Sequence, residues 1–518
     1  MNLSYIKTHV PLLIFLAIYF CFTFLTYKDY GATGDEWTER RAAQDLSRYL
    51  KSPTSYDSII NLNYNDKINV VYGHHPLVTK YQRSYQLVQN YFNFKGYYEW
   101  GHLLNLIFGS VLFIFTYALF YLHYKSLAKA IIPVIFLVSC ARLFGDIPTN
   151  NKDVPFAIFY LISIFFIYVF LNQKQKGSAY LKIISLGIIF GITQTFRTVG
   201  FSIYFVYIFY FFYVEFIEGR KFSISKIADF VLELFIIVVF SLFVSMSIFP
   251  WLGSNFFANF FHLLLDAKSF QNWDDTIFFA GEFLFKADRP WYYLFTWIFI
   301  TMPIYILALI GSSVFFGKKL FKNKLFAISS IAFLVNIALY LILQPVVYNG
   351  IRHFLFLIPI MVIISTTVLY KVIENRKAFV VISILISINI VSIGWNFVIL
   401  HPYEYIYFNE LVGGIRGASG KYELDYWGAS YKEAAEWIVN NTDLTQKDFI
   451  YACNVDYAVD YYSGKKFFMT YGYPEYANYT ICDSENEMKR NYTGKILYEV
   501  KRDGVILNTV REHEKTKF

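Results

Sequence analysis

The chain has 518 residues and a formal net charge of +8, with 56% hydrophobic, 21% aromatic and only 16% charged residues. Soluble domains carry roughly 45–50% apolar and about 25% charged residues, so this composition excludes an ordinary soluble enzyme. The basic residues form short clusters between apolar runs rather than one basic face, which excludes a nucleic-acid partner and indicates a membrane protein.

Apolar segments long enough to cross a bilayer recur as far as residue 400. They predict a mainly α, polytopic membrane protein with about eleven transmembrane helices. We expect the first apolar run to be retained as a span, because no A-x-A-like cleavage site follows it. The predicted spans are 10–27, 102–122, 128–144, 154–171, 181–196, 199–217, 227–249, 291–316, 325–343, 354–370 and 378–400.

Basic residues between the spans indicate which loops face the cytoplasm. With a cytoplasmic N-terminus, the inner loops carry most of them, whereas the short outer turns hold only Lys152, Arg197 and Arg352. We therefore expect an integral protein of a bacterial plasma (inner) membrane, with a cytoplasmic N-terminus and an extracytoplasmic C-terminal part. The inner basic residues are Lys7, Lys125, Lys129, Lys174, Lys176, Lys182, Arg220, Lys221, Lys226, Lys318, Lys319, Lys322, Lys324, Lys371, Arg376 and Lys377.

This orientation places three long segments outside the cytoplasm. We predict that residues 1–400 form the transmembrane domain and that residues 401–518 form a small extracytoplasmic α/β subdomain. The transmembrane domain contributes a first outer loop, 28–101, and a later outer loop, 251–290. Apolar and polar residues alternate in the first loop in a way that predicts short amphipathic helices on the bilayer surface, near 42–50 and 82–92.

The C-terminal tail has the patterns of a small α/β unit. They predict a helix over 431–441, a strand over 449–455, and a hairpin of 496–500 with 505–510 that turns at Asp503-Gly504. Cys453 and Cys482 lie in this tail and can pair if it faces an oxidising compartment, although their spacing does not establish the geometry.

Acidic residues stand at the outer ends of two predicted spans. Asp35 and Glu36 follow the first span and can supply a general base and a partner that orients an acceptor or a metal; two solvated loop acids are the alternative. Asp153 precedes the fourth span, where a negative charge is favourable at a helix N-terminus, so a capping role is the alternative to catalysis.

Cations stand at the same outer ends, where the orientation rule disfavours them. Lys152, Arg197, Arg352 and His353 form a pocket for an anionic lipid phosphate if they converge with the acids. Arg352 is the best candidate, because a guanidinium offers two parallel hydrogen bonds to phosphate and keeps its charge. Each cation alone can instead extend to lipid headgroups.

No resident cofactor is predicted. Adjacent histidines point in different directions, so His74 and His75 predict no metal site, and no second pair has the spacing of ligands. The neighbouring carboxylates Asp35 and Glu36 leave a divalent metal open.

These features together resemble the membrane-embedded glycosyltransferases of the GT-C fold, in the branch of the protein O-mannosyltransferases and the lipid A aminoarabinose transferase. The resemblance covers roughly the first 400 residues. It rests on four motifs in order, Gly34–Glu36, Asn151–Phe156, Pro290–Tyr293 and Arg352–Phe354. The tail resembles those of bacterial relatives through His401–Tyr403 and Asp425–Gly428, for which the resemblance implies no role.

The resemblance implies transfer of a sugar from a polyprenyl-phosphate-linked donor to an extracytoplasmic glycolipid, polysaccharide or protein, with Asp35 and Asp153 matching the two catalytic acids. A phosphate leaving group needs cations rather than a proton, while the acceptor hydroxyl needs a base. We assign the base to Asp35 and expect inversion at the anomeric carbon. The alternative is a polytopic lipid or glycan transporter, or a flippase without transferase activity, which predicts charged or broken helices near the bilayer midplane.

Overall fold

The computed structural model describes residues 9–40, 84–91, 96–172, 179–219, 223–248, 255, 257–259, 261, 276–285, 288–445, 448–470, 473–490 and 492–513. The predicted helix near 42–50 and the residues His74 and His75 lie outside this part of the chain. The predicted helix near 82–92 is confirmed, because residues 84–91 are helical.

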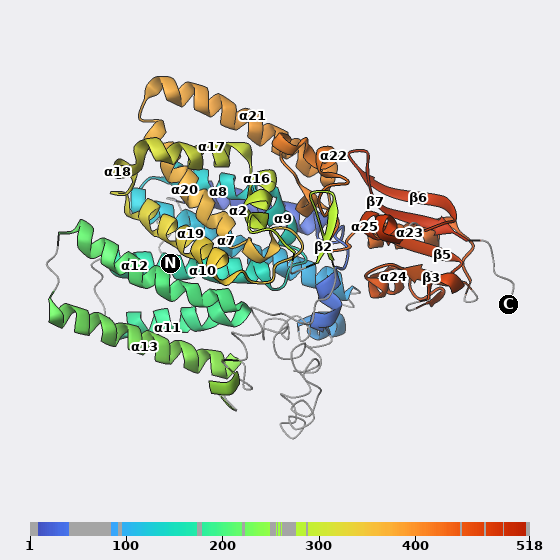
Figure 1. Cartoon of the computed structure of the whole chain (residues 1–518), viewed down its shortest axis with the longest axis horizontal. Coiled ribbons are helices and arrows are strands. Elements are labelled where there is room, and N and C mark those ends of the chain that lie inside the picture. Colours follow the sequence, from blue (N-terminus) through green and yellow to red (C-terminus); the bar gives the residue numbers. More distant parts are fainter. Residues whose placement is uncertain are drawn as a thin grey trace.

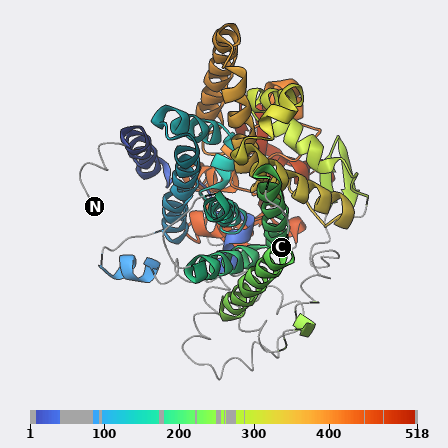
Figure 2. The ribbon, with the colours of Figure 1, turned by 90° about the vertical axis from the view of Figure 1, so that its left-hand side faces the viewer.

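A bundle of apolar helices makes up most of the molecule (Figures 1 and 2). Among the described residues, six helices are long and apolar enough to cross a membrane, or seven with one bent pair, and four shorter apolar helices accompany them. Each predicted span coincides with one of these helices or with the bent pair, which confirms the fold class. The helices are α2 (Val10–Thr26), α7 (Tyr97–Tyr124), α8 (Leu127–Val138), α10 (Asp153–Asn172), α11 (Ala179–Phe196), α12 (Ser202–Ile217), α13 (Ile224–Ile248), α16 (Tyr293–Thr301) with α17 (Ile304–Ser312), α19 (Lys324–Leu343), α20 (Leu357–Val372) and α21 (Arg376–Leu400).

Two predicted spans are interrupted. The run at 291–316 is bent by 116° between α16 and α17, at Pro303, which has no N–H to continue the helix. The run at 128–144 divides into α8 and the short helix α9 (Ala141–Asp146). Hydropathy does not reveal the break between α16 and α17, because the residues on both sides of it are equally apolar.

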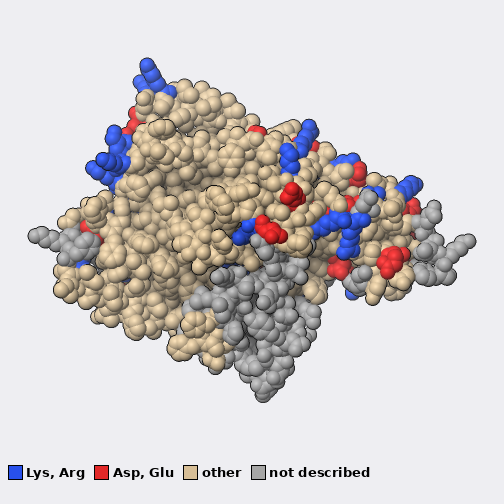
Figure 3. All heavy atoms as spheres, viewed as in Figure 1, with Lys and Arg blue, Asp and Glu red and all other residues tan. Residues whose placement is uncertain are grey.

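The bundle has two different ends. At one end, here called the basic end, lie Lys318 and Lys319 of the short helix α18 (Gly317–Leu320) and the start of α21 at Arg376. The other end, here called the sheet end, packs against the C-terminal region (Figure 1). Figure 3 shows Lys and Arg side chains gathered at the basic end, and between the two ends a broad surface almost free of charge. Such an uncharged band fits lipid.

The C-terminal region is a sheet with helices packed on it. The strand order is β4-β3-β5-β7-β6, with β3 parallel to β4 and β5, and β7 antiparallel to β5 and β6. The predicted helix, first strand and hairpin are confirmed by α23, β3, β6 and β7. The elements are α23 (Tyr431–Asn441), β3 (Phe449–Ala452), α24 (Asp456–Tyr462), β4 (Phe468–Met469), β5 (Tyr479–Asp483), α25 (Ser484–Arg490), β6 (Lys495–Arg502) and β7 (Val505–Glu512).

Smaller elements connect the bundle to this sheet. A hairpin of β1 and β2 touches the C-terminal segment through a bridge between Phe279 and Tyr422. The connecting elements are η2 (Thr198–Phe201), β1 (Thr276–Phe279), β2 (Glu282–Phe285), η3 (Ser313–Phe316), η4 (Arg352–Phe354), η5 (Glu404–Ile406), η6 (Glu410–Val412), α22 (Gly414–Ala418) and η7 (Pro474–Tyr476).

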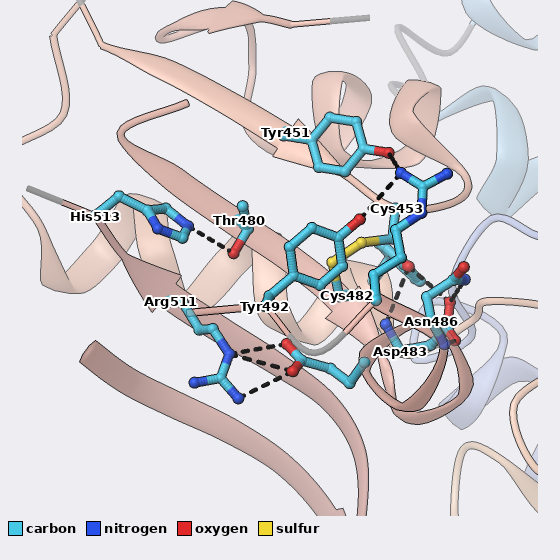
Figure 4. The surroundings of a disulfide bond; sticks show 12 residues. Tyr451, Cys453, Thr480, Cys482, Asp483, Asn486, Tyr492, Arg511 and His513 are labelled. Carbon is cyan, nitrogen blue, oxygen red and sulfur yellow. Dashed lines mark hydrogen bonds and ion pairs between the residues drawn. A yellow bond between two sulfur atoms is a disulfide. The ribbon is translucent and has the colours of Figure 1, made fainter. Parts of the chain in front are cut away.

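Figure 4 shows a disulfide between Cys453 and Cys482, which joins the residue after β3 to β5. The two Cα atoms are 4.9 Å apart, and the Cys453 N–H donates to the carbonyl of Ile481 at 3.0 Å. Disulfides persist in oxidising compartments, which is the environment expected for this tail.

Candidate active site

An ionic cluster lies at the sheet end of the bundle, where three segments distant in sequence meet. Residues 34–40 form a short helix after α2 that carries Asp35. Arg352 of η4 places Nη2 at 3.3 Å from Asp35 Oδ2 and Nε at 3.9 Å from Asp153 Oδ2. Asp153, the first residue of α10, also pairs with Arg197. Four of the predicted site residues therefore form one chain of alternating charge, Asp35–Arg352–Asp153–Arg197.

Asn150, rather than Asp153, caps the N-terminus of α10. The Asn150 side-chain oxygen accepts hydrogen bonds from the backbone N–H groups of Asp153 at 2.7 Å and of Lys152 at 3.2 Å. Asn150 Nδ2 also donates to Asp153 Oδ2 at 3.2 Å. The Asp153 carboxylate is thus directed at the two guanidinium groups instead of at its own helix backbone.

Arg352 is held as a charged group in a nearly dry environment. Its side chain is 5% exposed, whereas that of Asp35 is 38% exposed. Burial alone disfavours the guanidinium charge, but Asp35 and Asp153 outweigh it and the pKa of Arg352 is raised overall. The aromatic rings of Trp427 and Tyr348 lie at 4.5 Å and 5.0 Å from the guanidinium carbon.

His353 lies beside this cluster as a neutral imidazole. Burial and the positive charges of Arg197 and Arg352 lower its pKa well below the usual value. Its Nε2 has no hydrogen-bond partner among the described residues, and its ring packs edge-on against Tyr348. His353 can therefore offer a phosphate a hydrogen bond but not a positive charge.

Glu36 faces away from Arg352. One carboxylate oxygen accepts the backbone N–H of Thr33 at 2.8 Å, and the other lies 3.1 Å from His102 Nε2 on α7. Successive helical residues point about 100° apart, so the two neighbouring acids reach different surroundings. The contacts of Glu36 fix the start of the helix that carries Asp35.

Glu39, which the sequence patterns did not single out, lies four residues after Asp35 on the same helix face. It is buried and accepts a hydrogen bond from Asn151 Nδ2 at 2.6 Å. Burial raises the pKa of its carboxyl to about 8, against the opposing charge of Lys152. The signal that could have found Glu39 is its four-residue spacing from Asp35. This spacing places two residues on one face only if a helix is expected over residues 34–40.

A small, partly open pocket lies beside Glu39. Its walls mix two acids, an arginine, an amide and two phenol rings. The lining residues are Glu36, Glu39, Arg40, Tyr97, Tyr98, Gly101 and Asn151.

The described residues contain no group of three or more His, Cys, Asp or Glu side chains that could hold a metal ion. Asp35 and Asp153 both approach Arg352 instead, and Glu36 approaches His102. Guanidinium groups of the chain supply positive charge next to these acids.

Solved structures of ArnT match nearly the whole chain. The crystal structure of ArnT from Cupriavidus metallidurans bound to undecaprenyl phosphate has a TM-score of 0.54 and 12% sequence identity, over 96% of this chain and 97% of that chain. The chain has the GT-C fold. The apo crystal structure of the same ArnT matches with a TM-score of 0.52 and 11% identity, over 98% of both chains. The resemblance of the sequence motifs to GT-C enzymes is confirmed at the level of the fold.

No protein-family model and no curated protein matches this sequence. The likeness to ArnT is therefore carried by the arrangement of the helices and of the C-terminal region rather than by sequence identity.

Proposed function

We propose that this protein is an integral membrane glycosyltransferase that moves a sugar from a polyprenyl-phosphate-linked donor to an acceptor outside the cytoplasm. The observation that carries the proposal is the ionic cluster Asp35–Arg352–Asp153–Arg197, with Arg352 and Asp153 buried at its centre, in a chain that shares its fold with ArnT, which was solved bound to undecaprenyl phosphate. Paired charges that are partly removed from water at one site are typical of functional sites.

In this proposal Arg352 binds the phosphate of the donor. The phosphate replaces Asp35 as a partner of the guanidinium, which can form two parallel hydrogen bonds to it. Lys152, just before α10, and Arg197, just after α11, add positive charge. As the bond between the anomeric carbon and the phosphate oxygen breaks, the electron pair leaves with the phosphate, so this step needs cations rather than a proton.

Asp35 is then the general base for the acceptor. It is the most exposed acid of the cluster, and its release from Arg352 by the incoming phosphate leaves a carboxylate next to the anomeric carbon. The acceptor hydroxyl gives its proton to Asp35 while its oxygen bonds to the anomeric carbon on the face opposite the phosphate. Attack on that face inverts the configuration. The acceptor can be a glycolipid, a polysaccharide or a protein.

The rival assignment is a transporter or flippase, which needs charged or broken helices within the membrane. The break between α16 and α17 is filled by an uncharged side chain. Asn409 Nδ2 donates to the carbonyls of Phe299 at 2.6 Å and Met302 at 2.9 Å. These contacts satisfy backbone groups that the break releases, so the break does not require a transported ion.

Turnover by the purified full-length protein tests the proposal. With an undecaprenyl-phosphate-linked sugar in lipid nanodiscs, we expect release of undecaprenyl phosphate, measured by mass spectrometry. Arg352→Lys keeps the charge but loses the paired hydrogen bonds, and we expect about 10²-fold lower kcat/KM. The matched control is Arg416→Lys, an arginine 68% exposed and paired with Asp503 in the C-terminal region. Movement of the lipid across the bilayer without release would favour the flippase.

A further inference from the structure

The loop before α23 reaches back from the C-terminal region to the ionic cluster. Trp427 in this loop is 2% exposed, and its indole ring lies 4.5 Å from the guanidinium carbon of Arg352. A buried aromatic face in this position stabilises the cation and restricts its orientation. Trp427 lies in the segment between α21 and α23, so this contact connects the bundle to the C-terminal region.

Hydrogen bonds fix the plane of the indole. Trp427 Nε1 donates to Asp146 Oδ1 at 2.8 Å, and the Tyr426 hydroxyl donates to the other oxygen of Asp146 at 3.3 Å. Asn150 Nδ2 also donates to Asp146, at 3.3 Å, and Asn150 is the residue that holds Asp153. Trp427 is thereby connected to both partners of the Arg352–Asp153 pair.

The backbone of the same residue holds the helix that carries Asp35. The N–H of Gly34, at the start of that helix, donates to the Trp427 carbonyl at 3.0 Å. The preceding segment is held in the same way, because Ala32 N–H donates to the Tyr462 hydroxyl at 2.9 Å and the Tyr457 hydroxyl donates to the Thr33 carbonyl. The C-terminal region therefore sets where the helix of Asp35 begins.

Hydrogen bonds and a sterically restricted glycine hold the conformation of this loop. The buried carboxylate of Asp425 accepts the backbone N–H groups of Ala429 and Ser430, both at 3.1 Å. Gly428 adopts φ +69°, and a Cβ atom there would lie 2.5 Å from Val455 Cγ2. A tight turn that only glycine fits thus presents Trp427 to the bundle.

We infer that Trp427 is a positioning residue for the transfer reaction: its ring orients Arg352 while its carbonyl sets the helix of Asp35, so that the C-terminal region completes the active site. The inference rests on the proposed function. It assigns a role to the Asp425–Gly428 motif, namely to position Arg352 and the helix that carries Asp35. Loss of the ring should act on the lipid donor, whose phosphate Arg352 binds.

Two substitutions separate positioning from general stability. Trp427→Leu removes the aromatic face and the N–H donor, and we expect kcat/KM for the lipid donor to fall about 30-fold, the equivalent of about 2 kcal/mol for a desolvated cation–π contact. Trp427→Phe keeps a ring face but loses the donor to Asp146, and we expect a loss of only about fivefold, which corresponds to one hydrogen bond. In both variants the loss should lie mainly in the KM for the donor.

Trp437→Leu is the matched control, since Trp437 of α23 stacks on Tyr498 in the same region without touching the cluster. We expect its kcat and donor KM to equal those of the wild type. Trp427→Phe with wild-type kcat and KM would overturn the inference, whether or not Trp427→Leu folds. An equal loss in Trp437→Leu would overturn it as well. Wild-type protein that releases no undecaprenyl phosphate would instead overturn the proposed function.

Discussion

The two ends of the helical bundle use charged residues in different ways. At the basic end, Lys324 of α19 pairs with Glu218, and the two side chains remain 27% and 26% exposed. At the sheet end, Arg352 lies near Asp153, with 5% and 3% exposure. Exposed pairs contribute about 0–1 kcal/mol, because water screens them and long side chains lose entropy.

Burial changes this balance. Removing charges from water is costly, and partners in good geometry must offset the cost. A buried Arg352–Asp153 pair at the centre of an ionic cluster is therefore poor evidence for stability alone and good evidence for a site that needs fixed charge. The comparison predicts that substitutions at the sheet end affect activity strongly, whereas those at the basic end do not.

The largest effect is expected for Asp35→Asn. The amide cannot accept the acceptor's proton, so kcat should fall by about 10²–10⁴-fold. Donor binding should change little, because the Arg352 guanidinium remains. Initial rates of sugar transfer with the purified variant measure this, and Asp443→Asn, an exposed acid of the C-terminal region, is the control. Near-normal transfer by a correctly inserted Asp35→Asn protein would remove Asp35 as the base.

Asp153→Asn is expected to follow. Its loss leaves the guanidinium groups of Arg352 and Arg197 without their shared carboxylate, and breaking such a buried pair is destabilising by about 3–5 kcal/mol. We expect a lower Tm in detergent and reduced transfer. Arg197→Met disrupts the same ion pair as Asp153→Asn. The loss of stability in the double variant should therefore be smaller than the sum of the losses in the two single variants. Additive losses would separate Arg197 from the cluster.

Glu39→Gln should change the pH dependence of stability. An ordinary glutamate titrates near 4.5, whereas burial raises the pKa of Glu39 to about 8. Between these values the folded protein keeps a proton that the unfolded chain has lost, so stability falls as the pH rises, by at most about 1.4 kcal/mol per pH unit. The glutamine variant lacks this contribution. Its Tm should fall less than that of the wild type between pH 5 and pH 8, and parallel Tm curves would contradict the burial of a protonated Glu39.

The smallest effect is expected at the basic end. Lys371 pairs with Glu374 on the protein surface, where the glutamate is 62% exposed. Lys371→Ala should leave kcat/KM within about twofold of the wild type and Tm nearly unchanged, because exposed pairs are worth little. A large loss of transfer in this variant would break the distinction between the two ends.

Most of the fold is predictable from the sequence, for physical reasons. Bilayer thickness imposes a length on apolar runs, so hydropathy predicts every span. The hairpin of β6 and β7 is predictable from the Asp503-Gly504 turn between two alternating runs. The break at Pro303 is not, since proline is tolerated in spans whose freed carbonyls find partners, and Asn409 lies more than a hundred residues away in sequence.

The site is predictable in part. The membrane orientation predicted from the basic residues places four site residues at one end of the bundle: Asp35, Asp153, Arg197 and Arg352. In the structure these four side chains form one cluster. Sequence pattern alone could not separate Asp35 from Glu36. The structure separates them because Thr33 and His102 hold the carboxylate of Glu36, whereas Asp35 pairs with Arg352. The part played by Trp427 was hidden for a similar reason, since its partners come from three other segments.

Binding of the lipid phosphate tests the central claim most directly. Undecaprenyl phosphate can be titrated into purified wild-type protein, Arg352→Ala and Lys371→Ala, with affinity read by native mass spectrometry or thermal shift. We predict binding to the wild type and to Lys371→Ala with equal affinity, and at least about tenfold weaker binding to Arg352→Ala, as expected for loss of a charge-assisted hydrogen-bonded pair. Equal affinity for Arg352→Ala and wild type would contradict a phosphate site at this cluster.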